Sequence, residues 1–265
     1  MQTETPNSPA PPDQDAQLRV TILYDNTAYD SRLRPEWGFA ALVEYEGHTL
    51  LFDTGGDGPT LLGNAGALGI DLQPIDTIVL SHEHGDHTGG LHALLDQGIT
   101  PTVYVPAAFP PTIKDAIRDR TQLVEVTGPH EILPGVHSTG QMGSDIVEQG
   151  LVIDTSEGPV VITGCAHPGI VDMVRRANEI LEGEIALVVG GFHLGNLGRG
   201  TLKGIIDDFR ELGVKRASPT HCTGAIAIAM FATAYGDDYV KGGAGRVISL
   251  GARSFTSPLP TFEPA

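Results

Sequence analysis

The chain has 265 residues, 40% of them hydrophobic, so it is long enough to bury a large apolar core within one α/β domain. Lysine and arginine number 16 against 33 aspartates and glutamates, which gives a formal net charge of −17. A protein with this charge is repelled by phosphate backbones and anionic membranes, and no apolar run approaches the roughly 20 residues of a membrane span. Nucleic acids and membranes are therefore excluded as expected partners.

Residues 1–17 contain four prolines and no large apolar residue after Met1. This composition predicts a disordered N-terminal tail, followed by a single domain over residues 18–265. The tail lacks the basic start and apolar stretch of a secretory signal. The two cysteines each lie inside a motif and could form at most one disulfide. We therefore expect a reduced, cytoplasmic protein.

Strand-like and helical patterns alternate along the rest of the chain. Strands are predicted at 18–24, 39–45, 48–53, 75–80, 103–105, 123–126, 152–154, 160–163, 185–189, 217–220 and 246–250. Helices are predicted at 59–68, 89–95, 112–118, 170–181, 205–212 and 225–235. The order hairpin, glycine turn, helix, buried strand and histidine-bearing loop occurs twice, and it pairs His84 with His193. Two such halves facing each other predict a four-layer αββα sandwich, with sites where the loops of both sheets converge.

An early loop between the first two predicted strands contains Arg32, Arg34 and Trp37. An arginine there would suit a phosphate or carboxylate group of a substrate. The loop either covers a pocket or is plain surface.

The densest group of metal-ligand side chains directly follows the predicted strand 75–80. The run Ser81-His82-Glu83-His84-Gly85-Asp86-His87 brings three imidazoles and the Asp86 carboxylate together. A strand that ends in such a turn directs its polar side chains into one open pocket. Neutral imidazole and carboxylate are ligands of divalent metals such as zinc. The run therefore predicts a metal site, and Glu83, between the ligands, is expected to be exposed.

The His-x-His-x-Asp-His pattern resembles the defining motif of the metallo-β-lactamase-fold hydrolases, and Leu51-Phe52-Asp53-Thr54-Gly55 resembles the first motif of that family. Further segments resemble a subfamily labelled 7,8-dihydropterin-6-methyl-4-(β-D-ribofuranosyl)-aminobenzene-5'-phosphate synthase-like: Asp25-Asn26, Gly164-Cys165-Ala166-His167-Pro168-Gly169, Gly190-Gly191-Phe192-His193-Leu194 and His221-Cys222-Thr223-Gly224. The resemblance covers about residues 18–255 and implies the four-layer αββα metallo-β-lactamase sandwich.

The resemblance also implies two metal positions in one pocket. It assigns His82 and His84 to the first metal, together with a third histidine from a later loop. It assigns Asp86 and His87 to the second metal, with a late histidine for which His221 is the best candidate. Zinc is the expected metal, as one or two ions, with manganese and iron as alternatives.

The expected third ligand of the first metal is His167, and His137 is the alternative. Most members of the wider family carry an aspartate after Thr-Gly that bridges the two metals, but this chain has Cys165 there. A thiolate is a competent zinc ligand, and a small buried cysteine beside the site is the alternative. His193 is expected to be a ligand, a general acid or a substrate contact, and the alternative is a histidine that only hydrogen-bonds to a ligand.

A metal-activated water would be the nucleophile, with Asp86 and His193 as the candidate catalytic residues. Asp53 is expected to orient a ligand histidine rather than bind a metal, and Cys222 is expected to be a packing residue. These residues predict a metal-dependent hydrolase that acts on a small molecule, which can be anionic, and a phosphoester or a lactone is the expected substrate class.

Three other functions stay open at the level of sequence. One is a synthase, as the subfamily label says. Another is a di-iron redox enzyme on the same fold, although those relatives carry a glutamate where this chain has His84, and usually a flavin partner domain. The third is a non-catalytic binding protein that retains the fold.

Overall fold

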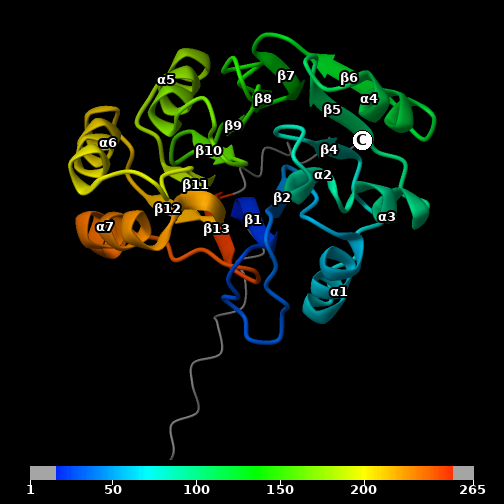
Figure 1. Cartoon of the computed structure of the whole chain (residues 1–265), viewed down its shortest axis with the longest axis horizontal. Coiled ribbons are helices and arrows are strands. Elements are labelled where there is room, and N and C mark those ends of the chain that lie inside the picture. Colours follow the sequence, from blue (N-terminus) through cyan, green and yellow to red (C-terminus); the bar gives the residue numbers. More distant parts are fainter. Residues whose placement is uncertain (1–15, 253–265) are drawn as a thin grey trace, which may run out of the picture.

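The computed structural model describes residues 16–252 as two β-sheets packed face to face, with helices on the outer side of each sheet (Figure 1). This is the predicted four-layer αββα sandwich. Of the expected tail, only Ala16 and Gln17 are described, and both belong to the first strand. The rest of the tail lies outside the described residues. None of the helices within residues 16–252 is long and apolar enough to cross a membrane.

The first sheet has seven strands in the order β13-β1-β2-β3-β4-β5-β6. Their bounds are β1 Ala16–Tyr24, β2 Ala40–Tyr45, β3 His48–Phe52, β4 Thr77–Val79, β5 Thr102–Pro106, β6 Leu123–Val126 and β13 Val247–Ala252. A tight hairpin turn at Glu46-Gly47 joins β2 to β3, and both turn residues have positive φ. Type I′ turns require that backbone conformation, which matches the twist of the two strands.

The second sheet has six strands in the order β12-β11-β10-β9-β8-β7. Their bounds are β7 His130–Leu133, β8 Val136–Ser138, β9 Leu151–Ile153, β10 Val160–Thr163, β11 Leu187–Gly191 and β12 Ala217–Thr220. The predicted strands 152–154 and 160–163 correspond to β9 and β10, which pair antiparallel as a hairpin. Strands β7 and β8 were not predicted, because they are short and the buried residues along them are few.

Helices cover both outer faces. They are α1 Gly58–Leu68, α2 Gly85–Thr88, α3 Leu91–Asp96, α4 Pro111–Arg118, α5 Ile170–Ile180, α6 Arg199–Glu211 and α7 Ala225–Tyr235, with short 3₁₀ turns at His221–Thr223 and Gly236–Asp238. The helix predicted at 89–95 starts later, at Leu91, because Gly89 and Gly90 lie against backbone carbonyls of Gly56 and Thr54. Added Cβ atoms there would approach those oxygens to 2.1 Å.

Three apolar clusters hold the layers together. One lies between the sheets and includes Leu18, Phe52 and Val189, all fully buried. The second lies under α1, α3 and α4, and the third under α5, α6 and α7. Burial of this much apolar surface is the main favourable term in folding, so the sheets form a rigid frame for the loops at their ends.

The parallel strands of both sheets end at the same edge of the sandwich. Strands β3 and β4 are parallel, as are β10, β11 and β12. Their carboxyl ends therefore deliver the loops that carry the predicted site residues to one place.

Candidate metal centre

The predicted ligands come from three loops that follow strand ends. The loop after β4 leads into α2, the loop after β10 precedes α5, and the 3₁₀ turn after β12 precedes α7. Contacts between their side chains bring together all seven predicted ligands: His82, His84, Asp86, His87, Cys165, His167 and His221.

The imidazole rings pack closely against one another. The ring centroid of His82 lies 4.7 Å from that of His84, 4.2 Å from that of His87 and 4.8 Å from that of His167. The rings of His87 and His221 lie 5.0 Å apart. Such spacing directs several ring nitrogens into one small volume.

Two sets of donor atoms within this cluster lie close enough to hold a metal ion. In each set the donor atoms lie within 4.8 Å of one another; the sets are His82, Cys165 and His167, and His87, Cys165 and His221. Cys165 is common to both sets. Its thiol therefore lies between the two sets, at the sequence position where the wider family is expected to carry a bridging aspartate.

Two further predicted ligands border these sets. Asp86 Oδ2 lies 3.6 Å from His87 Nε2 and 3.4 Å from His221 Nε2. His84 Nδ1 lies 3.1 Å from His82 Nε2. Glu83 is exposed, as predicted.

Buried atoms without a partner test whether these residues fit a metal. His167 Nε2 and His221 Nε2 are buried, and neither has a hydrogen-bond partner. Leaving such a nitrogen unsatisfied costs free energy, and native structures rarely do so without a reason. One of the two belongs to each donor set, so a metal ion at each position would satisfy it.

Asp53 fixes the orientation of His87. Its Oδ2 accepts a hydrogen bond from Ser81 Oγ at 2.7 Å and lies 2.7 Å from His87 Nδ1. With Nδ1 held by the carboxylate, His87 Nε2 is left to face Cys165 Sγ at 3.3 Å. This agrees with the prediction that Asp53 orients a ligand.

Asn26 holds His221 in the same manner. Its amide nitrogen donates to His221 O at 3.0 Å, and its Oδ1 lies 2.9 Å from His221 Nδ1. The other ring nitrogen, Nε2, thereby faces Asp86 Oδ2 at 3.4 Å. Neutral tautomers with Nδ1–H on an acceptor are those that leave Nε2 free for a metal.

Glu148 is an important residue that the sequence did not reveal. It is fully buried and accepts hydrogen bonds from the backbone N–H groups of Cys165, Ala166 and His167 at 2.8–2.9 Å. Burial raises the pKa of Glu148, while these three donors oppose the rise. The Glu148 side chain binds the backbone of the loop that carries Cys165 and His167. It is not a ligand itself, so no metal-ligand spacing in the sequence marks Glu148.

The electrostatic environment differs among the candidate ligands, and it favours the metal-binding form of His82, His167 and Asp86. Burial and the neighbouring histidines lower the pKa of His82, and the same causes lower that of His167 to about 4, which keeps both imidazoles neutral. Burial alone would raise the pKa of Asp86, but the adjacent His221 and His87 hold it well below the usual range. Burial lowers the pKa of His87, but the Asp53 carboxylate raises it more. The net pKa is therefore raised, which favours the protonated ring.

His193 and Cys222 lie at the rim of this cluster. The His193 ring is 4.4 Å from that of His167, and together with Cys165 and Cys222 it forms a third set of donor atoms. Cys222 is partly exposed and its Sγ donates to Cys165 O at 3.6 Å. The alternative ligand His137 lies elsewhere, on β8 in register with Val152.

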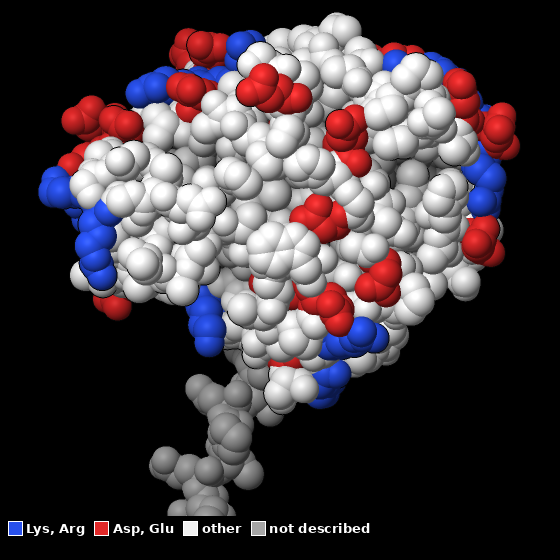
Figure 2. Space-filling view, viewed as in Figure 1, with Lys and Arg blue, Asp and Glu red and all other residues white. Residues whose placement is uncertain are grey.

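The early loop lies against the same cluster. The Trp37 ring centroid is 5.1 Å from that of His221, and 61% of Trp37 is exposed. Arg32 and Arg34 are paired with Asp30 and Glu36 on that loop. Figure 2 shows Lys and Arg mostly at the rim of the face in view, with uncharged and acidic residues in its middle.

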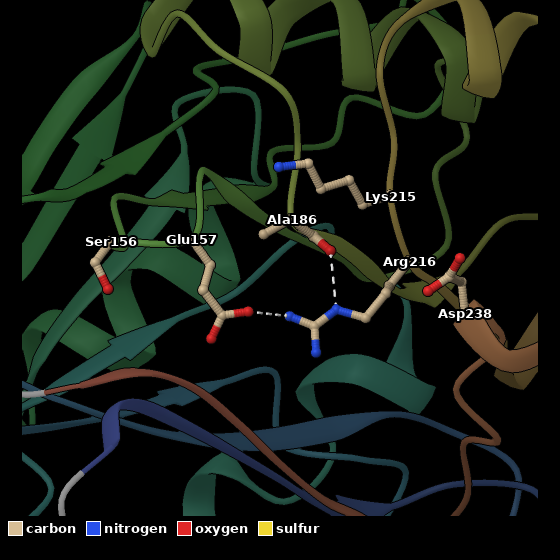
Figure 3. A pocket seen from close by; sticks show the side chains of 6 residues that line it. All are labelled: Ser156, Glu157, Ala186, Lys215, Arg216 and Asp238. Carbon is tan, nitrogen blue, oxygen red and sulfur yellow. Dashed lines mark hydrogen bonds and ion pairs between the residues drawn. The ribbon is translucent and has the colours of Figure 1, made fainter.

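A hollow lies at the opposite end of the strands, near the amino ends of β10, β11 and β12. It has a volume of about 390 Å³ and is lined by Ser156, Glu157, Ala186, Lys215, Arg216 and Asp238 (Figure 3). Arg216 bonds to Glu157 at 2.8 Å and donates to Ala186 O at 3.3 Å. The lining contains no histidine or cysteine, so this hollow lacks the imidazole and thiol donors found at the other edge.

Comparison with known proteins agrees with this geometry. The family model of the metallo-beta-lactamase superfamily matches residues 35–176. The chain is 28% identical to the 7,8-dihydropterin-6-methyl-4-(beta-D-ribofuranosyl)-aminobenzene-5'-phosphate synthase of Methanocaldococcus jannaschii, over 87% of this chain and 95% of that protein.

Solved structures show the same fold. The crystal structure of Tm1679, a metal-dependent hydrolase of the beta-lactamase superfamily, superposes with a TM-score of 0.74 at 28% identity and covers 88% of this chain and 99% of that one. Human tRNase Z, short form, superposes with a TM-score of 0.60 at 18% identity, over 88% and 99% of the two chains. At that identity the likeness concerns the fold alone.

Proposed function

The chain belongs to the metallo-beta-lactamase superfamily, and from this premise we propose that it is a metal-dependent hydrolase of a small molecule. The observation that carries the proposal is the pair of donor sets that share Cys165, each with a buried imidazole nitrogen that lacks a hydrogen-bond partner. Divalent metal ions held there would act as Lewis acids and would lower the pKa of a water molecule.

The ligands we propose are the two donor sets, each with the residue that borders it. The first position takes His82, His84, Cys165 and His167, and the second takes Asp86, His87, Cys165 and His221. Zinc is the metal we propose, because imidazole, thiolate and carboxylate together suit it best; manganese and iron are the alternatives.

Asp86 and His193 are the catalytic residues we propose. The Asp86 carboxylate is held ionised and lies between two histidines, so its oxygen can accept a proton from a nucleophilic water. A hydrogen bond with Cys222 raises the pKa of His193, and the exposed imidazole can then donate a proton to a leaving group. A phosphoester or a lactone offers a leaving oxygen of that kind.

Metal analysis and turnover test the proposal together. Protein purified without chelator should contain one to two transition-metal ions per chain, and it should cleave a member of a panel of phosphoesters and lactones. Protein that holds no metal and takes up none on titration would rule the proposal out. Both cysteines are free thiols, which supports work in a reducing compartment such as the cytoplasm.

A synthase is the second candidate, because the M. jannaschii synthase matches this chain along nearly its whole length. Isotopically labelled water separates the two functions. A hydrolase places ¹⁸O from water in a product, whereas a synthase that joins two substrates does not.

A further inference from the structure

We propose that Trp37 is a binding subsite for an uncharged, planar heteroaromatic ring of the substrate. The inference rests on the proposed function, because it concerns the same candidate metal centre. The Trp37 ring lies 5.1 Å from that of His221, a candidate ligand, while 61% of the residue remains exposed. A ring stacked on the open part of the indole would therefore lie beside the metal centre.

Two hydrogen bonds fix the backbone directly after Trp37. Gly38 N donates to Asn26 Oδ1 at 3.1 Å, and Phe39 N donates to Asp86 O at 3.2 Å. A Cβ added to Gly38 would lie 2.5 Å from Asp86 O, so this close approach requires glycine. The indole is thus presented at a defined position rather than on a loose loop.

The same contacts tie the indole to the metal centre. Asn26, which holds Gly38, also binds both the backbone and the ring of His221. Asp86, which holds Phe39, lies 3.4 Å from His221 Nε2. The distance between Trp37 and the metal ligands is therefore set by the residues that position those ligands.

Exposure of the Trp37 indole to water is unfavourable, and a bound ring that covers the indole would remove this unfavourable free energy. Among the described residues, the large apolar side chains that are exposed are Tyr29, Trp37, Leu197 and Ile226, and Trp37 is the most exposed of them. An apolar ring left in water forfeits the stabilisation that burial would give it. Of these four, Trp37 is the one whose ring packs on a candidate ligand.

The charges nearby select the kind of ring. Arg34 is paired with Glu36 at 2.8 Å, and Arg32 is paired with Asp30. These cations are already neutralised, so the loop offers a flat apolar surface rather than an anion site. Stacking on an aromatic face suits any planar heteroaromatic ring, such as a pterin or a purine.

Fluorescence gives a direct test, because Trp37 is the single tryptophan of the chain. The zinc-loaded full chain would be titrated with pterin and with adenine, and with cyclohexanol as a non-aromatic control. We expect saturable quenching by the two rings and none by cyclohexanol. Quenching that does not saturate, or that cyclohexanol matches, would overturn the inference.

Variants separate stacking from a general apolar effect. By calorimetry, Trp37→Ala should weaken ring binding about tenfold or more, Trp37→Phe should retain most of it, and Ile226→Ala should change it less than about twofold. Circular dichroism and zinc content check that each variant is folded and loaded. Equal loss in Trp37→Ala and Ile226→Ala, or none in either, would reject stacking on Trp37.

The two proposals fail in different ways. Wild-type protein that hydrolyses a non-aromatic ester but shows no saturable quenching would reject the Trp37 subsite alone. Protein that binds neither zinc nor another metal would reject the proposed function, whatever the fluorescence shows.

Discussion

The two ends of the sandwich are built in opposite ways. At the carboxyl ends of the strands, titratable side chains are buried and strained backbone is frequent. Four of the five described non-glycine residues with positive φ lie there: Asp53, Ala166, His193 and His221. At the amino ends, the polar groups are partly exposed ion pairs such as Arg216 with Glu157, and the fifth residue, Glu46, lies in an ordinary hairpin turn.

The difference shows that the strained backbone of this fold is concentrated at the carboxyl ends of the strands. A residue other than glycine with positive φ costs of order 1–3 kcal/mol and persists only where its surroundings hold it. Asp53 is held by Ser81 and His87, Ala166 by Glu148, and His221 by Asn26. Ion pairs in water need no such support and contribute about 0–1 kcal/mol each.

Asp86→Ala should have the largest effect at the carboxyl end. Loss of residues that merely orient a metal ligand costs roughly 10–100-fold, so loss of a proposed ligand should lower kcat/KM by more than about a hundredfold. The control is Glu83→Ala, which removes an exposed carboxylate from the same motif and should leave the rate unchanged. Turnover by Asp86→Ala at the wild-type rate would show that the catalytic assignment is wrong.

Cys165→Ser tests the thiol that the two donor sets share. A hydroxyl is a harder and far less acidic donor, so the second metal should bind roughly tenfold more weakly or worse. Cys165→Asp should retain two metals, because a carboxylate is also a metal ligand. Competitive chelation with elemental analysis measures this, and Cys222→Ser, measured alongside, shows the effect of losing a thiol that belongs only to the third donor set. Equal affinity in wild type and Cys165→Ser would make Cys165 a packing residue.

The pH dependence of stability should come from the buried end. The pKa of His167 falls from 6.5 to about 4 on folding, so between these values the unfolded chain binds more protons than the folded chain. Stability of the metal-free protein should therefore decrease as the pH is lowered from about 6.5 to about 4. Thermal unfolding measured across that range tests this. In His167→Gln the loss should be smaller, and an unchanged slope would contradict the assignment.

Arg216→Ala at the amino end should have the smallest effect. The pair with Glu157 is partly exposed, so its loss should change the free energy of unfolding by less than about 1 kcal/mol. Metal content and turnover should stay at wild-type values. Urea unfolding and metal analysis check both, and a lost metal would mean that the two ends are coupled.

The sequence predicts the parts of the site that are local or share a motif. His82 to His87 lie within one turn after a strand, and their ligand chemistry is evident from the residue types alone. Cys165, His167 and His221 could be proposed because the segments around them resemble a family. Both kinds of prediction depend on side chains that face the pocket directly.

Residues that act on the backbone of others could not be predicted. Glu148 accepts hydrogen bonds from three N–H groups of a loop 17–19 residues further on, and nothing in Glu148-Gln149-Gly150 marks that partner. Strands β7 and β8 have too few apolar residues to show a period. Helix α6 begins at Arg199, and its first six residues were not predicted because Gly200 and Gly204 interrupt the apolar pattern. These features depend on tertiary contacts that sequence patterns do not encode.

The bond between Asn26 and His221 has a consequence for protein synthesis, because it joins residues that are 195 positions apart. The donor set of His82, Cys165 and His167 is complete once the chain has been translated through β10 and α5. The set with His221 must wait until β12 has emerged, and translation proceeds at about 5–20 residues per second. All residues of one donor set are thus synthesised seconds before His221, which completes the other set.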